Sequence, residues 1–98
     1  MANEVNTVPL RGEIYWVDFN PSRGSEQAGV RPAVVISTDS ANRALPVVTI
    51  AAVTTKIKNF QSKLQVILPE GEPLKEKSAI LAFQVVTIDK SRLRDRAG

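Results

Sequence analysis

The hydrophobic residues of this 98-residue chain fall into five short runs, and polar stretches rich in proline, glycine, serine and asparagine separate them. Short runs rich in valine, isoleucine and aromatic residues predict β-strands. We expect these strands at 12–19, 32–38, 47–54, 63–68 and 78–89. Because no segment shows the repeat of a long amphipathic helix, the pattern predicts a mainly β fold, either a small barrel or a strongly twisted sheet.

Apolar residues occupy both faces of the first predicted strand. Ile14 and Trp16 lie on one face and Tyr15 and Val17 on the other, as in a strand that is covered on both sides. We therefore expect Trp16 to lie in the core or in a dimer interface rather than to stack on a bound base. A thin core with apolar faces to spare also favours a homodimer.

The remaining segments predict little regular structure. Residues 39–45 are expected to form one helical turn, capped by Asp39 or Ser40 and ended by Pro46. The polar tail 90–98 is compatible with the start of a helix. Residues 1–10 are interpreted as a leader and residues 11–98 as a single domain.

The composition removes several kinds of chemistry. The chain has no histidine and no cysteine, so it lacks the commonest general base near neutral pH and the commonest metal ligands. The acids Asp18, Glu26 and Asp39 are scattered over different elements, so we expect no metal site and no cofactor. No apolar run approaches the ~20 residues of a membrane span, and no secretory signal is present, which favours a cytoplasmic protein.

The net charge of +3 is small but unevenly distributed, because residues 40–69 contain four basic side chains and no acid. A basic surface of this kind suits a phosphate-bearing partner. Lysines at strand ends also discourage edge pairing, and on charge alone this second explanation is favoured. Cleavage of RNA is one reaction open to such a chain, because the ribose 2′-hydroxyl supplies the nucleophile and an arginine can stabilise the phosphorane.

The segment "RGEIYWVDFNPSRGSEQAGVRPAVVIS" at 11–37 carries an RGxIxxVDxxP start followed by GxEQxGxRP. It resembles the N-terminal signature of the MazF/PemK family, the toxins of bacterial toxin–antitoxin modules. "NR" at 42–43, "AAVTT" at 51–55 and "QVVTIDKSRL" at 84–93 also match, so the resemblance covers residues 11–96.

The resemblance implies a sequence-specific endoribonuclease that cleaves single-stranded mRNA without metal and leaves a 2′,3′-cyclic phosphate and a 5′-hydroxyl. It also implies an SH3-like barrel, a homodimer and an antitoxin whose C-terminal segment covers the RNA groove. Relatives usually continue into a C-terminal helix that this chain lacks, and some carry an acid where Phe83 stands here. The alternatives are a gyrase-binding toxin of the CcdB type, which does not cleave RNA, and a plain interaction module.

The family's catalytic arginine and threonine match Arg31 and Thr54. Arg31 would bind the scissile phosphate, and the alternative is a structural ion pair with Glu26 or Asp39. The hydroxyl of Thr54 would hold a phosphate oxygen, unless the residue serves only as a strand former. Alternation along the strand predicts that Thr55 points the other way.

Glu26 is a candidate general base, and the alternative is that it only orients Arg31. Gln84 shares a predicted face with Ile80, Ala82, Val86 and Ile88, where an amide would contact a base or bond within the core. Ser25 and Gln27 are expected to contact RNA or order the loop, and Asn42 and Lys56 are weaker candidates for RNA contact. Gly24 and Gly29 would permit unusual backbone angles.

Overall fold

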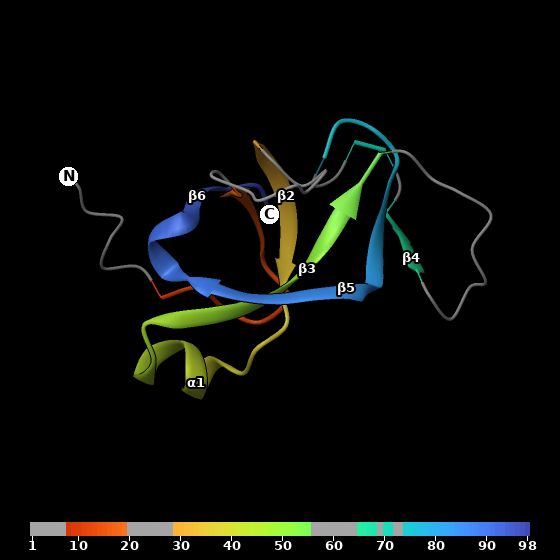
Figure 1. Ribbon diagram of the computed structural model, residues 1–98. Coiled ribbons are helices and arrows are strands. Elements are labelled where there is room, and N and C mark those ends of the chain that lie inside the picture. The colour runs from red at the N-terminus through yellow and green to blue at the C-terminus, as the bar shows by residue number, and fades with distance from the viewer. Residues whose placement is uncertain (1–7, 20–28, 56–64, 69, 72–73) are drawn as a thin grey trace.

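The chain forms one antiparallel sheet of six strands in the order β4-β5-β3-β2-β1-β6 (Figure 1). The structure is a computed structural model, and it describes residues 8–19, 29–55, 65–68, 70–71 and 74–98. The strands are β1 (Ile14–Asp18), β2 (Val30–Val35), β3 (Val47–Thr54), β4 (Gln65–Leu68), β5 (Ser78–Asp89) and β6 (Leu93–Arg96). The mainly β fold predicted from the sequence is confirmed, with a single short α-helix, α1 (Asp39–Ala44), among the described residues.

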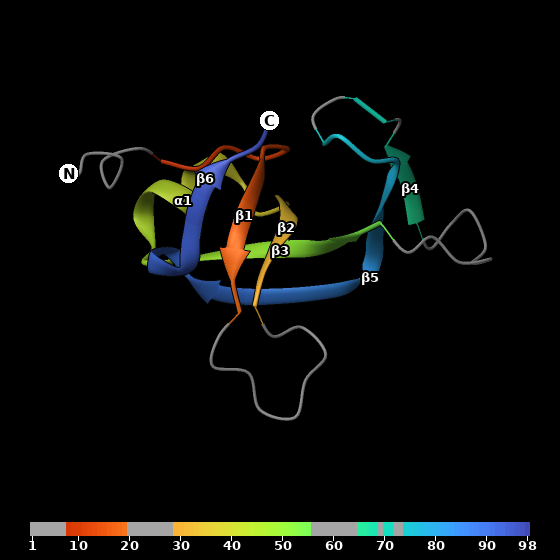
Figure 2. The ribbon, with the colours of Figure 1, turned by 90° about the horizontal axis from the view of Figure 1, so that it is seen from above.

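The sheet buries apolar residues on both of its faces. The first cluster joins β1, β2 and β3 on one face and contains Tyr15, Val17, Ala33, Val35, Val48 and Ile50. The second cluster lies on the opposite face and contains Ile14, Val34 and Ala51. Seen from above, the strands twist and the two ends of the sheet lie far apart, with β6 at one side and β4 at the other (Figure 2). The prediction of apolar residues on both faces is therefore correct for Ile14, Tyr15 and Val17.

Strand β2 begins at Val30, two residues before the predicted start, so Pro32 lies within the strand. Pro32 pairs with Trp16 of β1, whereas pairing with β3 begins at Ala33. Proline lacks an N–H and is tolerated in a strand where one side of the backbone has no ladder partner. At Arg31, the described pairing of β2 is therefore with β1.

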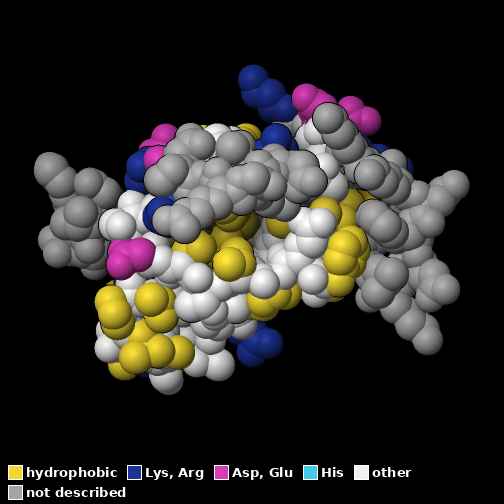
Figure 3. Space-filling view, viewed as in Figure 1, with side chains coloured by type: hydrophobic (Ala, Val, Ile, Leu, Met, Phe, Trp, Pro, Cys, Tyr) yellow, Lys and Arg dark blue, Asp and Glu magenta, His cyan; other side chains and the backbone are white. Residues whose placement is uncertain are grey.

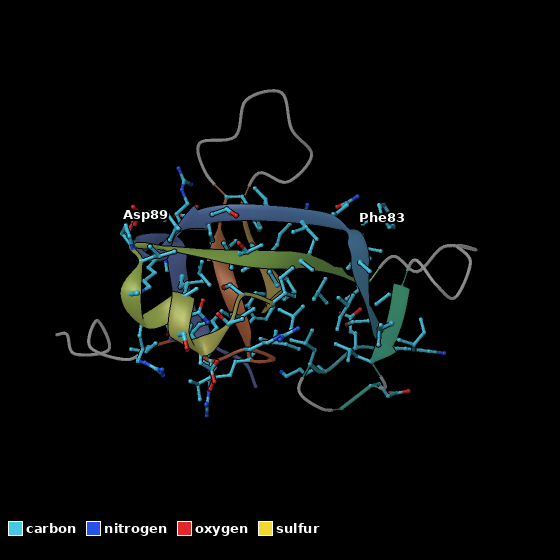
Figure 4. The ribbon with its side chains drawn as sticks, turned by 90° about the horizontal axis from the view of Figure 1, so that it is seen from below. Phe83 and Asp89 are labelled. Carbon is cyan, nitrogen blue, oxygen red and sulfur yellow. The ribbon has the colours of Figure 1, made fainter. Side chains whose placement is uncertain are left out.

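Strand β5 changes its register against β3 partway along. Val85 pairs with Ala51 and Ile80 pairs with Val53, so four residues of β5 lie opposite one residue of β3. Such an irregularity bends a strand and re-aims its side chains, and β5 turns sharply near Phe83 (Figure 4). The uniform face predicted for β5 is wrong, because Ile88 packs on the first cluster and Ile80 on the second.

Helix α1 begins one residue earlier than the predicted caps require. The side chain of Thr38 accepts a hydrogen bond from the N–H of Ala41, so Thr38 is the N-cap in place of Asp39 or Ser40. The helix ends before Pro46, as predicted. No helix among the described ranges is long and apolar enough to cross a membrane.

The tail does not continue as a helix. Lys90–Arg92 forms a single 3₁₀ turn, capped by the Asp89 side chain, which accepts from the N–H of Ser91. The chain then enters β6, which pairs with β1 and carries two arginines that bind Asp18 of β1 and Glu13, the residue just before β1. These long-range ion pairs fix a sequence that has little strand propensity of its own.

Candidate active site

Arg31 is the second residue of β2 and lies across from Val17 of β1. The connection from β1 to β2 ends just before Arg31. At its two ends, the N–H of Phe19 donates a hydrogen bond of 2.9 Å to the carbonyl of Gly29. Gly29 has a φ of +94°, a left-handed conformation that strains any other residue. The unusual angle predicted for Gly29 is therefore confirmed, and it directs the chain into the strand that holds Arg31.

Thr54 is the last residue of β3 and lies near the start of β2. The last pair between β2 and β3 is Ala33–Ala52, and Arg31 and Thr54 each lie two residues beyond it, at the adjoining ends of the two strands. Alternation assigns Arg31 to the face of Ala33 and Val35, and it assigns Thr54 to the face of Val48 and Ile50. Both residues line one groove, so both side chains can approach one phosphate group.

Gln84 lies in the irregular part of β5. It is the last of residues 81–84, which lie opposite Ala52 between the pairs Val53–Ile80 and Ala51–Val85, and it is exposed. Such an irregularity re-aims side chains, so the place of Gln84 beside Arg31 and Thr54 stays a prediction.

A groove of about 710 Å³ opens at the ends of β2 and β3. Its wall is formed by Trp16, Gly29, Val30, Arg31, Pro32, Val53, Thr54, Thr55, Leu74, Lys75, Glu76 and Ala97. Most of this lining is not on the face described above, because Trp16, Pro32 and Val53 alternate with the residues of the first cluster. Arg31 and Thr54 therefore stand at the rim between the groove and the first-cluster face. We place the chemistry on that face, since both side chains belong to it by alternation.

Neighbouring residues complete the wall of the groove. Trp16 is 38% exposed and lines the groove, so it does not lie in the core of the single chain, and a place in a dimer interface stays a prediction. Thr55 lines the groove together with Thr54, and strand alternation does not apply to it because β3 ends at Thr54. Leu74, Lys75 and Glu76 of the β4–β5 connection also line the groove, and nothing in the local sequence pattern pointed to them.

Asn42 does not belong to the exposed site. Its side chain is completely buried on α1, where its amide nitrogen donates to the carbonyls of Pro9 and Ser37 and its amide oxygen accepts from the hydroxyl of Ser37. A buried amide needs such partners. Through these bonds, the Asn42 side chain attaches α1 to the segment before β1. Of the other predicted residues, Ser25, Glu26, Gln27, Gly24 and Lys56 lie outside the described residues.

The groups with shifted pKa values lie away from Arg31. Burial raises the pKa of Glu13, but hydrogen bonds from the N–H of Leu10, from Arg96 and from Tyr15 outweigh burial and hold it below its ordinary value. Burial and the nearby Glu13 carboxylate raise the pKa of Tyr15 to about 12. Within the described ranges, no three acidic residues come together as they would around a metal ion.

Comparison with known proteins places the chain in a family. The family model of the PemK-like, MazF-like toxins of type II toxin–antitoxin systems matches residues 10–98. Endoribonuclease MazF of Staphylococcus saprophyticus is 38% identical over 87 residues, which cover 88% of this chain and 72% of that protein.

Two solved structures support the same placement. MazF of Deinococcus radiodurans is 32% identical, with a TM-score of 0.73 over 89% of this chain and 76% of that one. The MazE–MazF structure from the same organism contains a chain that is 29% identical, with a TM-score of 0.72 over 95% of this chain and 84% of its own length. The resemblance noted from the sequence is confirmed, and this chain belongs to the PemK-like, MazF-like toxin family.

Proposed function

We propose that the protein is the toxin of a toxin–antitoxin module and acts as an endoribonuclease on single-stranded mRNA. Membership of the MazF-like family and 38% identity to a MazF endoribonuclease support this function. The observation that supports the site is that Arg31 and Thr54, at the ends of β2 and β3, line the same groove.

The mechanism starts from the substrate's own nucleophile. The 2′-oxygen attacks the adjacent phosphorus, and the bond from phosphorus to the 5′-oxygen of the next nucleotide breaks. The products are a 2′,3′-cyclic phosphate and a 5′-hydroxyl. The guanidinium of Arg31 stabilises the negative charge that develops on the phosphorane, since its planar donors fit phosphate oxygens. The hydroxyl of Thr54 donates to one of those oxygens. This division of roles requires no metal ion.

Proton transfer is assigned to the loop before Arg31. Glu26 takes the proton of the 2′-hydroxyl or orients Arg31. The leaving 5′-oxygen takes its proton from solvent, because an arginine, whose pKa exceeds ~12, is a poor acid. Ser25, Gln27, Lys56 and Gln84 contact the RNA and contribute to sequence specificity. The exposed position of Gln84 on β5 supports its role.

Two protein partners belong to this function. A MazE-like antitoxin inhibits the toxin by covering the RNA site, as the existence of a MazE–MazF structure of similar fold supports. A second copy of the chain forms a homodimer. Phe83, Val85 and Val86 of β5 are each nearly half exposed, and hydrophobic side chains lie open on the face shown in Figure 3. A partner chain would remove this apolar surface from water. The protein acts in the cytoplasm, where mRNA is found.

Incubation with long RNA in EDTA, followed by mapping of cut sites and chemical analysis of the ends, tests the proposed function. Cleavage at a recurrent short sequence with cyclic-phosphate ends supports it, whereas a strict need for Mg²⁺ argues against it. Gyrase inhibition without RNA cleavage would favour the CcdB-type alternative, whereas the family model and the MazF relative favour the endoribonuclease.

A further inference from the structure

Two ion pairs of equal length connect β6 to the two ends of β1. One acid is Asp18, the last residue of β1, and the other is Glu13, the residue just before it. Arg94 binds the Asp18 carboxylate at 2.7 Å, and Arg96 binds the Glu13 carboxylate at 2.7 Å. Arg94 and Arg96 lie two positions apart on the same strand and are both substantially exposed. The first pair holds the end of β1 that leads toward Arg31, and the second holds the opposite end.

The first pair belongs to a larger clamp on Asp18. Arg92 donates a hydrogen bond of 3.1 Å to the backbone carbonyl of Asp18, in addition to the bond from Arg94 to its carboxylate. Asp18 therefore accepts hydrogen bonds through both its backbone and its side chain, from arginines far away in the sequence.

This clamp lies next to the strand segment that carries Arg31. Asp18 pairs with Val30, and Val17 pairs with Arg31, whereas pairing of β2 with β3 begins only at Ala33. The described ladder at Arg31 is therefore with β1. We expect a displacement of the end of β1 to move Val30 and Arg31 with it.

We propose that Asp18, Arg92 and Arg94 are positioning residues for Arg31, an assignment that rests on the proposed function. They touch neither substrate nor reacting atoms, and they act by holding the end of β1 in place. An exposed ion pair contributes little to overall stability, whereas a displacement of about 1 Å in a catalytic group can lower the rate about 100-fold. The clamp matters for rate more than for folding.

Because the two ion pairs have the same length, removal of each in turn gives a matched pair of variants. Arg94→Gln and Arg96→Gln each remove one arginine charge from β6, one beside Arg31 and the other at the far end of β1. We expect Arg94→Gln to lower kcat for RNA cleavage about 10-fold while KM changes less than about 3-fold. Arg96→Gln should leave kcat within about 2-fold, and both variants should lose a similar, small amount of Tm. Arg94→Lys, which keeps the charge, should recover part of the lost kcat.

Cleavage by the wild-type protein distinguishes failure of the proposed function from failure of the positioning role. If the wild-type protein does not cleave RNA in EDTA, the proposed function fails and the clamp has no reaction to serve. If it cleaves and Arg94→Gln retains the kcat of Arg96→Gln, the positioning role is overturned and the proposed function stands. A fall in Tm for Arg94→Gln with unchanged kcat at 20 °C would likewise reduce the clamp to a structural contact.

Discussion

Arg31 of β2 and Thr54 of β3 line one groove at the ends of neighbouring strands, each two residues beyond the pair Ala33–Ala52. This relationship joins the GSEQAGVRP segment to the AAVTT segment on one face of the sheet. It gives a cation and a hydroxyl that can bind the same phosphate group. Each of the following predictions tests one consequence of this arrangement or of the fold that supports it.

Substitution of Arg31 by alanine should nearly abolish cleavage. The guanidinium is the principal stabiliser of phosphorane charge in the proposed mechanism, and loss of such a donor typically lowers the rate about 100- to 1,000-fold. Arg31 is exposed near the start of β2, so folding should persist. Single-turnover cleavage and thermal unfolding measure the two effects. Arg43→Ala on the exposed side of α1 is the charge-matched control, and equal losses in both variants would argue against a specific role for Arg31.

The two threonines at the end of β3, Thr54 within the strand and Thr55 just after it, should differ in their effect on the cleavage rate. Thr54→Val keeps the branched shape and strand propensity but removes the hydroxyl, so we expect kcat to fall about 10-fold. Thr55→Val should change kcat less than about 3-fold, although Thr55 also lines the groove. Cleavage rates at saturating RNA provide the comparison. A larger loss for Thr55→Val would show that the hydroxyl was assigned to the wrong threonine.

Asn42→Ala should destabilise the protein without changing its intrinsic activity. The substitution removes hydrogen bonds to Pro9 and Ser37 inside the fold. Loss of a buried polar partner costs about 1–3 kcal/mol in free energy of unfolding, which corresponds to a Tm decrease of roughly 10 °C in a chain of this size. Urea unfolding measures the loss, with exposed Ser40→Ala as the control on the same helix. A stable Asn42→Ala variant with an altered cleavage motif would restore the role in RNA contact.

Stability should fall at alkaline pH through Tyr15. Its pKa rises from 10.0 to about 12 in the folded protein, because burial and the Glu13 carboxylate disfavour the phenolate. The folded state therefore holds the proton more tightly than the unfolded state. The resulting stabilisation is complete below pH 10 and is lost as the pH rises toward 12. Urea unfolding at pH 9, 10, 11 and 12 should show a steeper loss for the wild type than for Tyr15→Phe, and parallel curves would contradict the assignment.

Local sequence patterns predicted the elements that local residues determine. The apolar runs of β1, β3 and β5 were recognised because burial of a strand requires them. Strand β6 was missed because its sequence LRDR lacks such a pattern, and its place depends on Asp18 and Glu13 at the other end of the chain.

In the candidate site, too, the sequence predicted what local motifs determine and missed what the packing of distant residues determines. Arg31 and Thr54 were identified from motifs, and the register of the sheet then brought them together. Asn42 was misassigned because polarity alone does not show whether an amide faces a ligand or bonds inside the fold. The bend of β5 reverses the alternation of its side chains, and the end of β3 releases Thr55 from it. The hydrophobic pattern of the sequence predicts neither the bend of β5 nor the end of β3 at Thr54.

The most direct test of the central claim compares two oligonucleotides in EDTA. One is an all-RNA strand that contains the mapped cleavage motif, and the other is identical except for a 2′-deoxy nucleotide immediately before the cut. The account predicts cleavage of the RNA strand to a 2′,3′-cyclic phosphate and a 5′-hydroxyl, and no cleavage of the substituted strand. Cleavage of the substituted strand at the same bond would contradict it.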